Sequence, residues 1–382
     1  MNERSVSALV ALAVIVSLSF CAAAFGGDHE KSSPVIPQIQ NVAPTFVDST
    51  VPTNGDVNPY GVAFVPDDFP RGGVLHGGDL IVSNFNNLNN LQGTGTTIVR
   101  IVNGETPATF FQGQMGLGLT TALTVLRRGF VLVGDVPSTD GSGQCVAISG
   151  PEQNVGQGGL LVINKKGKLV KTIASAKFLN GPWDMTLIDR GDHATAFVAN
   201  VLSGTVTRLE LKVTGDGDGD SDDRVVVERE TQIASGYAIG CAGSAFVAGP
   251  TGVALDEKRD ILYVSSTGDN GIFAIERASD RESDAGMGKL VVSDAKHLHG
   301  PLGLILAPNG DLISAQGDAF NPDPTQPSEI VEFTREGKFV AQVSVDPAEG
   351  GAFGLALRAH GDDFVFAAVD DNVPDIQIWV VH

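Results

Sequence analysis

Basic residues are scarce in this sequence. Its 382 residues include 25 Lys and Arg against 45 Asp and Glu, which gives a formal net charge of −20 at pH 7. A surface with such an excess of negative charge repels nucleic acid and anionic lipid. We therefore exclude both as main partners of the protein.

Long apolar runs are also scarce, and the one that stands out covers residues 6–20. Arg4 precedes it and three alanines at residues 22–24 follow it, which is the pattern of a cleaved signal peptide. The run is shorter than the roughly 20 residues that a membrane-spanning helix needs. We predict a signal peptide over residues 1–24 and a single exported domain over residues 25–382, periplasmic or extracellular, with no membrane span after cleavage. A retained membrane anchor is the alternative.

Cysteines number only three. Cys21 would permit lipid attachment, but Phe20 precedes it where that signal requires a small residue. The predicted mature chain keeps Cys145 and Cys241, an even number that can pair in an oxidising compartment. We predict that these two form a disulfide, with two buried free thiols as the alternative.

Recognisable catalytic motifs are missing as well. The sequence contains no G-x-S-x-G nucleophile elbow, no H-E-x-x-H metal-binding helix and no phosphate-binding P-loop. Any catalytic site would therefore have to be assembled from loops that carry no standard signature.

What the sequence has in quantity is glycine, with 47 residues, and a 42% hydrophobic content that permits a substantial core. One short phrase recurs, an apolar strand that opens on a glycine or proline turn. Its six copies are N-P-Y-G-V-A-F from Asn58, L-T-T-A-L-T-V from Leu119, G-P-W-D-M-T-L from Gly181, G-P-T-G-V-A-L from Gly249, G-P-L-G-L-I-L from Gly300 and G-A-F-G-L-A-L from Gly351.

The spacing of the copies predicts the fold. The repeated glycine position falls at Gly61, Ala122, Asp184, Gly252, Gly303 and Gly354, so successive copies are 61, 62, 68, 51 and 51 residues apart. Each interval holds four short strands of alternating polarity with their turns. We predict an all-β six-bladed propeller with four-stranded antiparallel blades, whose glycines allow the inner strands to approach closely. The segment at residues 35–47 should complete the last blade beside residues 376–381, because closure removes exposed strand edges.

This repeat resembles those of the NHL-repeat and TolB-like six-bladed propellers, a superfamily that includes senescence-marker/gluconolactonase and strictosidine-synthase-like proteins. The resemblance covers nearly all of the predicted mature chain, and it implies the fold rather than an activity. Gluconolactonase-like proteins place acidic and amide metal ligands just before the repeat glycine. The metal site does not carry over, since those positions here are Tyr60, Thr121, Trp183, Thr251, Leu302 and Phe353.

In such a blade the start of the first strand and the end of the second lie at the same end of the ring. Aromatic rings beside amides and carboxylates are typical of a small-molecule or peptide pocket. We therefore predict a ligand site at this mouth of the channel; alternatively, the aromatics plug the channel and the polar residues cap strand ends. The candidate residues are Tyr60, Asn84, Asp135, Trp183, Asn200, Gln316, Asp318 and Phe353.

Two further patterns suggest metal chemistry. His297 and His299 precede the fifth copy and could serve as metal ligands or as acid and base groups, or could simply decorate the surface. The run G-D-G-D-G-D-S-D-D could bring alternate carboxylates together on a Ca²⁺ ion, although Ser221 stands where an EF-hand loop needs glycine. A solvated acidic hairpin is the other interpretation. The carboxylates concerned are Asp216, Asp218, Asp220 and Asp222.

The leading functional hypothesis is an exported binding or interaction protein, whose partner is a small molecule, a peptide or an envelope protein. The alternative is a lactonase-like hydrolase or lyase with a non-standard site, in which Asp135, Asp318 and the two histidines are candidates. A purely structural module is the third possibility.

Overall fold

The computed structural model describes residues 33–147, 152–242, 245–360 and 363–382. Residues Ser33–His382 form one compact unit. The predicted signal peptide, residues 1–24, lies outside the described residues. Within the described part of the chain, no helix has the length and apolar character needed to cross a membrane.

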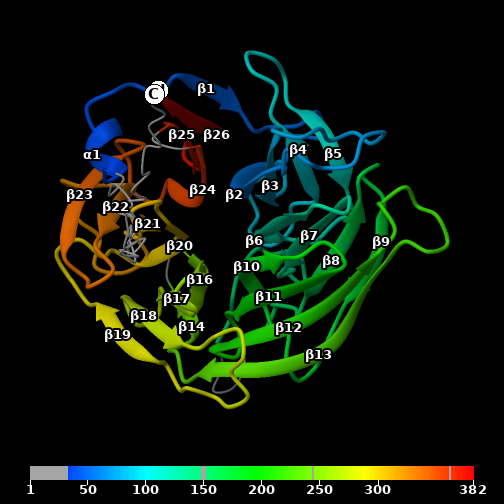
Figure 1. Cartoon of the computed structure of the whole chain (residues 1–382). Coiled ribbons are helices and arrows are strands. Elements are labelled where there is room, and N and C mark those ends of the chain that lie inside the picture. Colours follow the sequence, from blue (N-terminus) through cyan, green and yellow to red (C-terminus); the bar gives the residue numbers. More distant parts are fainter. Residues whose placement is uncertain (1–32, 148–151, 243–244, 361–362) are drawn as a thin grey trace, which may run out of the picture. The chain divides into compact units, whose positions relative to one another are not determined.

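Six four-stranded antiparallel sheets follow one another as blades around an axis, as predicted (Figure 1). Each blade runs from its inner to its outer strand in chain order, except the last. Blade 1 contains β2 (Val57–Phe64), β3 (Leu80–Asn86), β4 (Thr97–Arg100) and β5 (Ala108–Gln112). Blade 2 contains β6 (Leu119–Leu126), β7 (Phe130–Asp135), β8 (Gly159–Asn164) and β9 (Leu169–Ile173). Blade 3 contains β10 (Pro182–Asp189), β11 (His193–Asn200), β12 (Thr205–Thr214) and β13 (Arg224–Ser235).

The second half of the ring has the same plan. A short hairpin of β14 (Gly240–Ala242) and β15 (Ala245–Ala248) leads into it. Blade 4 contains β16 (Pro250–Asp256), β17 (Ile261–Ser266), β18 (Gly271–Glu276) and β19 (Lys289–Val292). Blade 5 contains β20 (Pro301–Leu306), β21 (Leu312–Gln316), β22 (Glu329–Phe333) and β23 (Phe339–Ser344). Blade 6 contains β24 (Ala352–His360), β25 (Asp363–Asp370), β26 (Asp375–Val381) and, as its outer strand, β1 (Phe46–Ser49).

The ring closes through the N-terminal part of the described chain, which confirms the predicted closure. Strand β1 pairs antiparallel with β26, from Phe46 opposite Ile378 to Ser49 opposite Asp375. In Figure 1 the blue β1 lies beside the red C-terminal strands. The outer edge of β26 is thereby covered by a segment from the other end of the chain.

The predicted bounds of the closing strand, residues 35–47, are wrong in part. Residues Ile36–Ile39 form a short helix, α1, and the strand begins only at Phe46. Buried Glu332 on β22 accepts hydrogen bonds from the backbone N–H groups of Val35 at 3.0 Å and Ile36 at 2.7 Å. The Glu332 carboxylate thereby caps the start of the helix against blade 5, so these two N–H groups cannot join a sheet ladder.

The repeat glycines pack the inner strands against one another, as the sequence predicts. A Cβ on Gly303 would lie 2.5 Å from the carbonyl oxygen of Phe353, and one on Gly354 would lie 1.9 Å from that of Tyr60. Blade 3 has Asp184 at this position. Its Oδ2 accepts a hydrogen bond from the backbone N–H of Val253 on β16, at 2.8 Å, so a side chain makes the link between blades 3 and 4.

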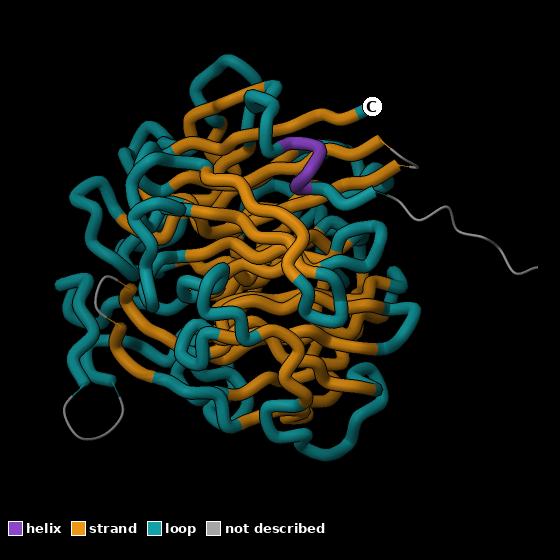
Figure 2. The backbone as a smooth tube through the Cα atoms, turned by 90° about the vertical axis from the view of Figure 1, so that its left-hand side faces the viewer, coloured by secondary structure: helices purple, strands orange, loops and turns teal. Residues whose placement is uncertain are grey.

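The hydrophobic core lies between neighbouring blades. Leu132 of blade 2 and Val198 of blade 3, for example, are fully buried in one cluster. Seen from the side, long loops project beyond the strands on the left of Figure 2. This loop-rich end is where the second strands finish and the third strands begin.

Candidate functional site

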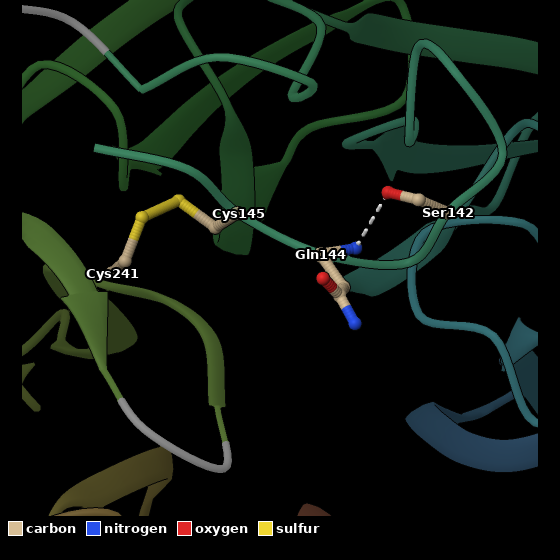
Figure 3. The surroundings of a disulfide bond; sticks show 4 residues. All are labelled: Ser142, Gln144, Cys145 and Cys241. Carbon is tan, nitrogen blue, oxygen red and sulfur yellow. Dashed lines mark hydrogen bonds between the residues drawn. A yellow bond between two sulfur atoms is a disulfide. The ribbon is translucent and has the colours of Figure 1, made fainter. Parts of the chain in front are cut away.

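A disulfide joins Cys145 to Cys241 at the loop-rich end, which confirms the predicted pairing (Figure 3). The two Cα atoms are 5.7 Å apart although 96 residues separate them in sequence. Cys145 lies in the long connection from β7 to β8 of blade 2, and Cys241 lies on β14, after blade 3. The bridge therefore crosses the loop-rich end of blade 3 and fixes two loops over it.

Five aromatic rings gather at the axis beneath these loops, and we call them the aromatic plug. Tyr60 stacks on Phe85 at 4.8 Å between ring centroids and on Phe353 at 4.6 Å, and Trp183 meets the edges of Tyr60 and Phe85 at 5.5 Å. Phe246 completes the group at 5.9 Å from Phe85. Since these rings come from several blades and contact one another, they fill the axis at this end.

Three of the predicted ligand residues, Tyr60, Trp183 and Phe353, thus belong to the plug. Trp183 is only 1% exposed, and its indole Nε1 has no hydrogen-bond partner. Burial, and then the charge of Asp371, raise the pKa of the Tyr60 hydroxyl far above its usual value. These contacts support channel closure, while direct contact with a ligand stays a prediction.

Three other predicted residues lie on second strands and bond within or beside their own blades: Asp135 and Asn200 are the last residues of β7 and β11, and Asn84 lies two residues before the end of β3. Asn84 donates to the carbonyl oxygen of Thr50 at 3.1 Å. Asn200 accepts from the backbone N–H of Asn180 at 3.1 Å, and Asp135 accepts from that of Gly159 at 3.0 Å. Burial raises the pKa of Asp135 to about 7. All three are bonded within the protein in this structure, and a ligand-binding role for them stays a prediction.

The last two predicted residues, Gln316 and Asp318, meet His299 and Glu329 in blade 5. Gln316 accepts a hydrogen bond from the backbone N–H of His299 at 2.9 Å, and the His299 ring bonds through Nδ1 to Glu329 Oε1. Ligand atoms of His299, Asp318 and Glu329 all lie within 4.8 Å of one another. All three side chains are buried. We call these three residues the blade-5 triad.

The blade-5 triad brings two buried carboxyl groups together in a site that disfavours charge on both of them. Asp318 Oδ2 accepts from the backbone N–H groups of Ser328 at 2.9 Å and Gly350 at 2.8 Å, but its Oδ1 has no partner. Glu329 Oε2 is likewise buried without a partner. Burial, and then the charge of Asp318, raise the pKa of Glu329 to about 9. An imidazole and two carboxylates in this arrangement could hold a metal ion.

The two histidines considered together in the sequence have separate environments. His297 bonds through Nδ1 to Asp294 at 2.6 Å, and its ring stacks on Phe339 at 3.8 Å between centroids. Only His299 joins the triad. Sequence reasoning missed Glu329, although one signal was available: it is the charged first residue of the apolar strand β22, which pairs with the strand that ends at the predicted Gln316.

The acidic run forms the turn between β12 and β13. Lys165 of blade 2 places its Nζ 3.1 Å from Asp216 Oδ2 and 3.2 Å from Asp218 Oδ1, and Lys166 also contacts Asp218 at 3.2 Å. Two of the four carboxylates, Asp216 and Asp218, therefore form ion pairs with lysines. The other two, Asp220 and Asp222, are exposed. Calcium binding here stays a prediction, and it would have to compete with these ion pairs.

The axis contains a cavity of about 270 Å³ on the other side of the aromatic plug. Its wall follows the plug residues along the same inner strands: Asp184 comes directly after Trp183, Gly354 comes directly after Phe353, and Val62 lies two residues after Tyr60. Among the lining residues only Asp184 has a carboxyl group, and burial raises its pKa well above the usual value. The other lining side chains are mostly aliphatic, although polar atoms make up a large part of the surface that faces the cavity. They include Val62, Leu123, Met185, Val253, Leu304 and Leu355, with Thr121 and Thr186 as hydroxyl groups.

Comparison with known proteins finds distant structural similarity and leaves the activity open. No protein-family model matches the chain, and no curated protein matches it. Virginiamycin B lyase from Staphylococcus aureus is similar at 14% identity and a TM-score of 0.46, over 88% of each chain. A gluconolactonase from Xanthomonas campestris is similar at 11% identity and a TM-score of 0.48, over 89% of this chain and 97% of that one. A nidogen–laminin complex contains a similar chain at 10% identity and a TM-score of 0.47, over 78% of this chain and 84% of that one.

Proposed function

We propose that the protein is a binding protein that takes a small, mainly apolar molecule with one hydrogen-bond acceptor into its axial cavity. The observation that carries this proposal is the cavity of about 270 Å³, whose wall combines mostly aliphatic side chains with a single carboxyl group and with exposed polar atoms of the inner strands. Binding sites for small molecules typically have this composition, with apolar walls for affinity and few polar groups for orientation. The proposal keeps the binding role expected from the sequence but places the ligand on the inner side of the aromatic plug.

Asp184 supplies the orienting group. The Val253 N–H holds the carboxyl in place at Oδ2, and burial favours its neutral form. A neutral carboxylic acid can donate its O–H to a carbonyl or ether oxygen of the ligand. Apolar surface removed from water adds about 25 cal/mol per Å². The ligand class that suits both features is a ketone, ester or lactone with an aliphatic body.

δ-Decalactone, which has a ring carbonyl and an aliphatic tail, is a suitable probe. We expect saturable binding by ligand-observed NMR, with no turnover. Thr186→Trp should abolish binding because Thr186 lines the cavity, whereas Thr172→Trp, on the exposed outer strand β9, should leave it unchanged. Asp184→Asn keeps an oxygen that can accept from the Val253 N–H, but it replaces the proposed O–H donor by an amide N–H. It should therefore change the affinity for probes that carry a hydrogen-bond acceptor. If Thr186→Trp binds the probe as tightly as wild type does, the cavity is not the binding site.

The same assay tests the lactonase-like alternative. Hydrolysis of δ-decalactone, or of the wider lactone, ester and glycoside panels with added Ca²⁺ or Zn²⁺, would identify an enzyme. Loss of that turnover in Asp135→Asn would point to the loop-rich mouth as the active site. We expect neither result.

We also propose that the protein acts outside the cytoplasm, where its partner would be a small molecule, a peptide or an envelope protein. The disulfide supports this location, because such bonds persist in oxidising compartments. Mass spectrometry of the protein from its native host should find a mature N-terminus near residue 25. An intact Met1 would contradict export by signal cleavage.

A further inference from the structure

The blade-5 triad is a built polar site rather than an accidental group of acids. Its three side chains are at most 7% exposed, and each comes from a different segment: the connection into β20, the turn after β21, and the first residue of β22. Two carboxylate oxygens, Asp318 Oδ1 and Glu329 Oε2, are buried and receive no hydrogen bond from a donor among the described residues. Leaving a buried charged acceptor unpaired is costly, so native structures rarely keep one without a bound ion or water.

The local backbone supports the same arrangement. Asp318 and Ser328 adopt positive φ angles of 52° and 47°, which non-glycine residues seldom do. These angles lie at the two ends of the loop that brings Asp318 back to Glu329. The strained conformation therefore serves to place the second carboxyl group beside the first, where two negative charges repel unless a proton or a cation lies between them.

We propose that His299, Asp318 and Glu329 bind one Zn²⁺-like divalent ion. This inference is independent of the proposed ligand in the axial cavity. One imidazole nitrogen and two carboxylate oxygens match the donor set of zinc, whereas Ca²⁺ and Mg²⁺ prefer ligands that are all oxygen. The ion takes the place of the proton that His299 and Glu329 share, and its charge neutralises the two buried carboxylates.

The ion has a structural task, because its ligands are too buried for a substrate to reach them. Asp318 also accepts a hydrogen bond from Gly350, in the connection to β24 of blade 6. A bound ion fixes Asp318 and, through it, that connection. It thereby holds the loop-rich end of blade 5 against blade 6, while the disulfide holds the end of blade 3.

Titration of chelator-stripped full-length protein with ZnCl₂, MnCl₂ and CaCl₂ tests the proposal. We expect one Zn²⁺ per chain by elemental analysis, a rise in melting temperature, and weaker or no binding of Ca²⁺. Asp318→Asn and Glu329→Gln should each weaken Zn²⁺ binding on the order of 100-fold, because each removes a charged ligand. Asp280→Asn and Glu336→Gln change the same two residue types at exposed positions outside the triad, so both should bind Zn²⁺ normally.

A spectroscopic readout guards against variants that fail to fold. Co²⁺ bound to the wild-type protein should show visible absorption bands of a low-symmetry nitrogen and oxygen site, and these should vanish when excess Zn²⁺ is added. Asp216→Asn combined with Asp218→Asn should leave the bands unchanged. Absence of stoichiometric Zn²⁺, tighter binding of Ca²⁺ than of Zn²⁺, or bands that persist in folded Glu329→Gln would each overturn the proposal.

Discussion

Blades 3 and 5 build their loop-rich ends on equivalent backbone positions. In blade 3 Asn180 precedes a Gly-Pro pair, and its backbone N–H donates to the side chain of Asn200 at 3.1 Å. In blade 5 His299 precedes a Gly-Pro pair, and its backbone N–H donates to the side chain of Gln316 at 2.9 Å. The two blades thus share one hydrogen-bonded frame at the point where the first and second strands meet the loops.

The chemistry added to this frame differs. Asn200 also donates to the hydroxyls of Thr205 at 3.3 Å and Thr207 at 3.1 Å, so the network of blade 3 is neutral and paired. Glu329 stands in blade 5 where Thr205 stands in blade 3, at the first residue of the third strand. A neutral network is satisfied by the protein alone, whereas a buried charged one needs a counter-ion.

The loops above the two blades are correspondingly held in different ways. A covalent bridge crosses blade 3, and the blade-5 triad with Gly350 links blade 5 to blade 6. The comparison teaches that one repeated scaffold can fix its loops by a covalent bond at one place and by a hydrogen-bonded contact, which the proposed ion would strengthen, at another. Four variants test this difference and the contrast between the two blades, in order of expected effect.

Removing the bridge over blade 3 should have the largest effect. Cys145→Ser with Cys241→Ser should lower the free energy of unfolding by roughly 2–4 kcal/mol, since a closed loop near 100 residues has an upper value of about 4.7 kcal/mol in the chain-entropy model. Urea titration of the variant and of wild type measures the change. Adding a reductant to wild type should reproduce it and should leave the variant unaffected. A change below roughly 0.5 kcal/mol would show that the bridge constrains little.

Introducing charge into the neutral network should have the next largest effect. Asn200→Asp should cost about 1–3 kcal/mol at pH 7, because it buries a carboxylate in a site whose partners suit an amide. Burial raises the folded-state pKa of such a group, so the loss should be small near pH 4 and should grow as the pH rises. Asn89→Asp, on an exposed loop, should change stability by less than roughly 0.5 kcal/mol. A loss that is equal at both pH values would contradict the electrostatic explanation.

The sequence predicted the frame of both blades better than their chemistry. The recurring glycine correctly marked the crowded inner strands, because a glycine that returns inside an apolar strand at blade spacing indicates close approach of neighbouring backbones. The disulfide followed from two cysteines whose connections leave the same end of the ring. Gln316, Asp318 and His299 were each recognised at this end.

What the sequence could not predict depends on side-chain direction and loop geometry. Glu329 reaches Asp318 only because the chain takes positive φ angles at Asp318 and Ser328, which no alternating pattern encodes. The aromatic residues before the repeat glycine could point toward a ligand or toward one another, and their spacing is the same in both cases. The sequence pattern of residues 36–39 predicts a strand, but the structure has a helix there. Its first N–H groups donate to Glu332, which is nearly 300 positions away in the sequence, and no local pattern could predict that contact.

The inner strands provide a further contrast, since blade 5 has Gly303 where blade 3 has Asp184. Gly303→Ala should cost about 1–3 kcal/mol, because its Cβ would lie 2.5 Å from the Phe353 carbonyl oxygen and the inner strands would have to separate. Gly104→Ala is the control: the added Cβ would lie in open space, but Gly104 has a positive φ. Its stability loss therefore measures backbone strain without crowding. Thermal unfolding of both variants compares the two costs. A smaller loss at Gly303 than at Gly104 would mean that the axis can widen freely.

Replacing the charged side chains of blade 5 by neutral amides, as in blade 3, should have the smallest effect on stability. Unlike the other changes, it should raise the free energy of unfolding. In metal-free protein, Asp318→Asn with Glu329→Gln should stabilise the fold by about 1 kcal/mol, because replacing buried charges by neutral groups of similar volume removes their repulsion and desolvation cost. The amide oxygen that replaces Asp318 Oδ2 can still accept from Ser328 and Gly350, so the loop keeps its hydrogen bonds. Asp323→Asn with Glu336→Gln makes the same change in net charge at more exposed positions of blade 5 and should leave stability within roughly 0.5 kcal/mol. Urea titrations with chelator present measure both pairs. Adding Zn²⁺ should then stabilise wild type and the control pair but not the blade-5 pair. If the blade-5 pair is less stable than wild type when chelator is present, the two carboxylates support the fold without an ion.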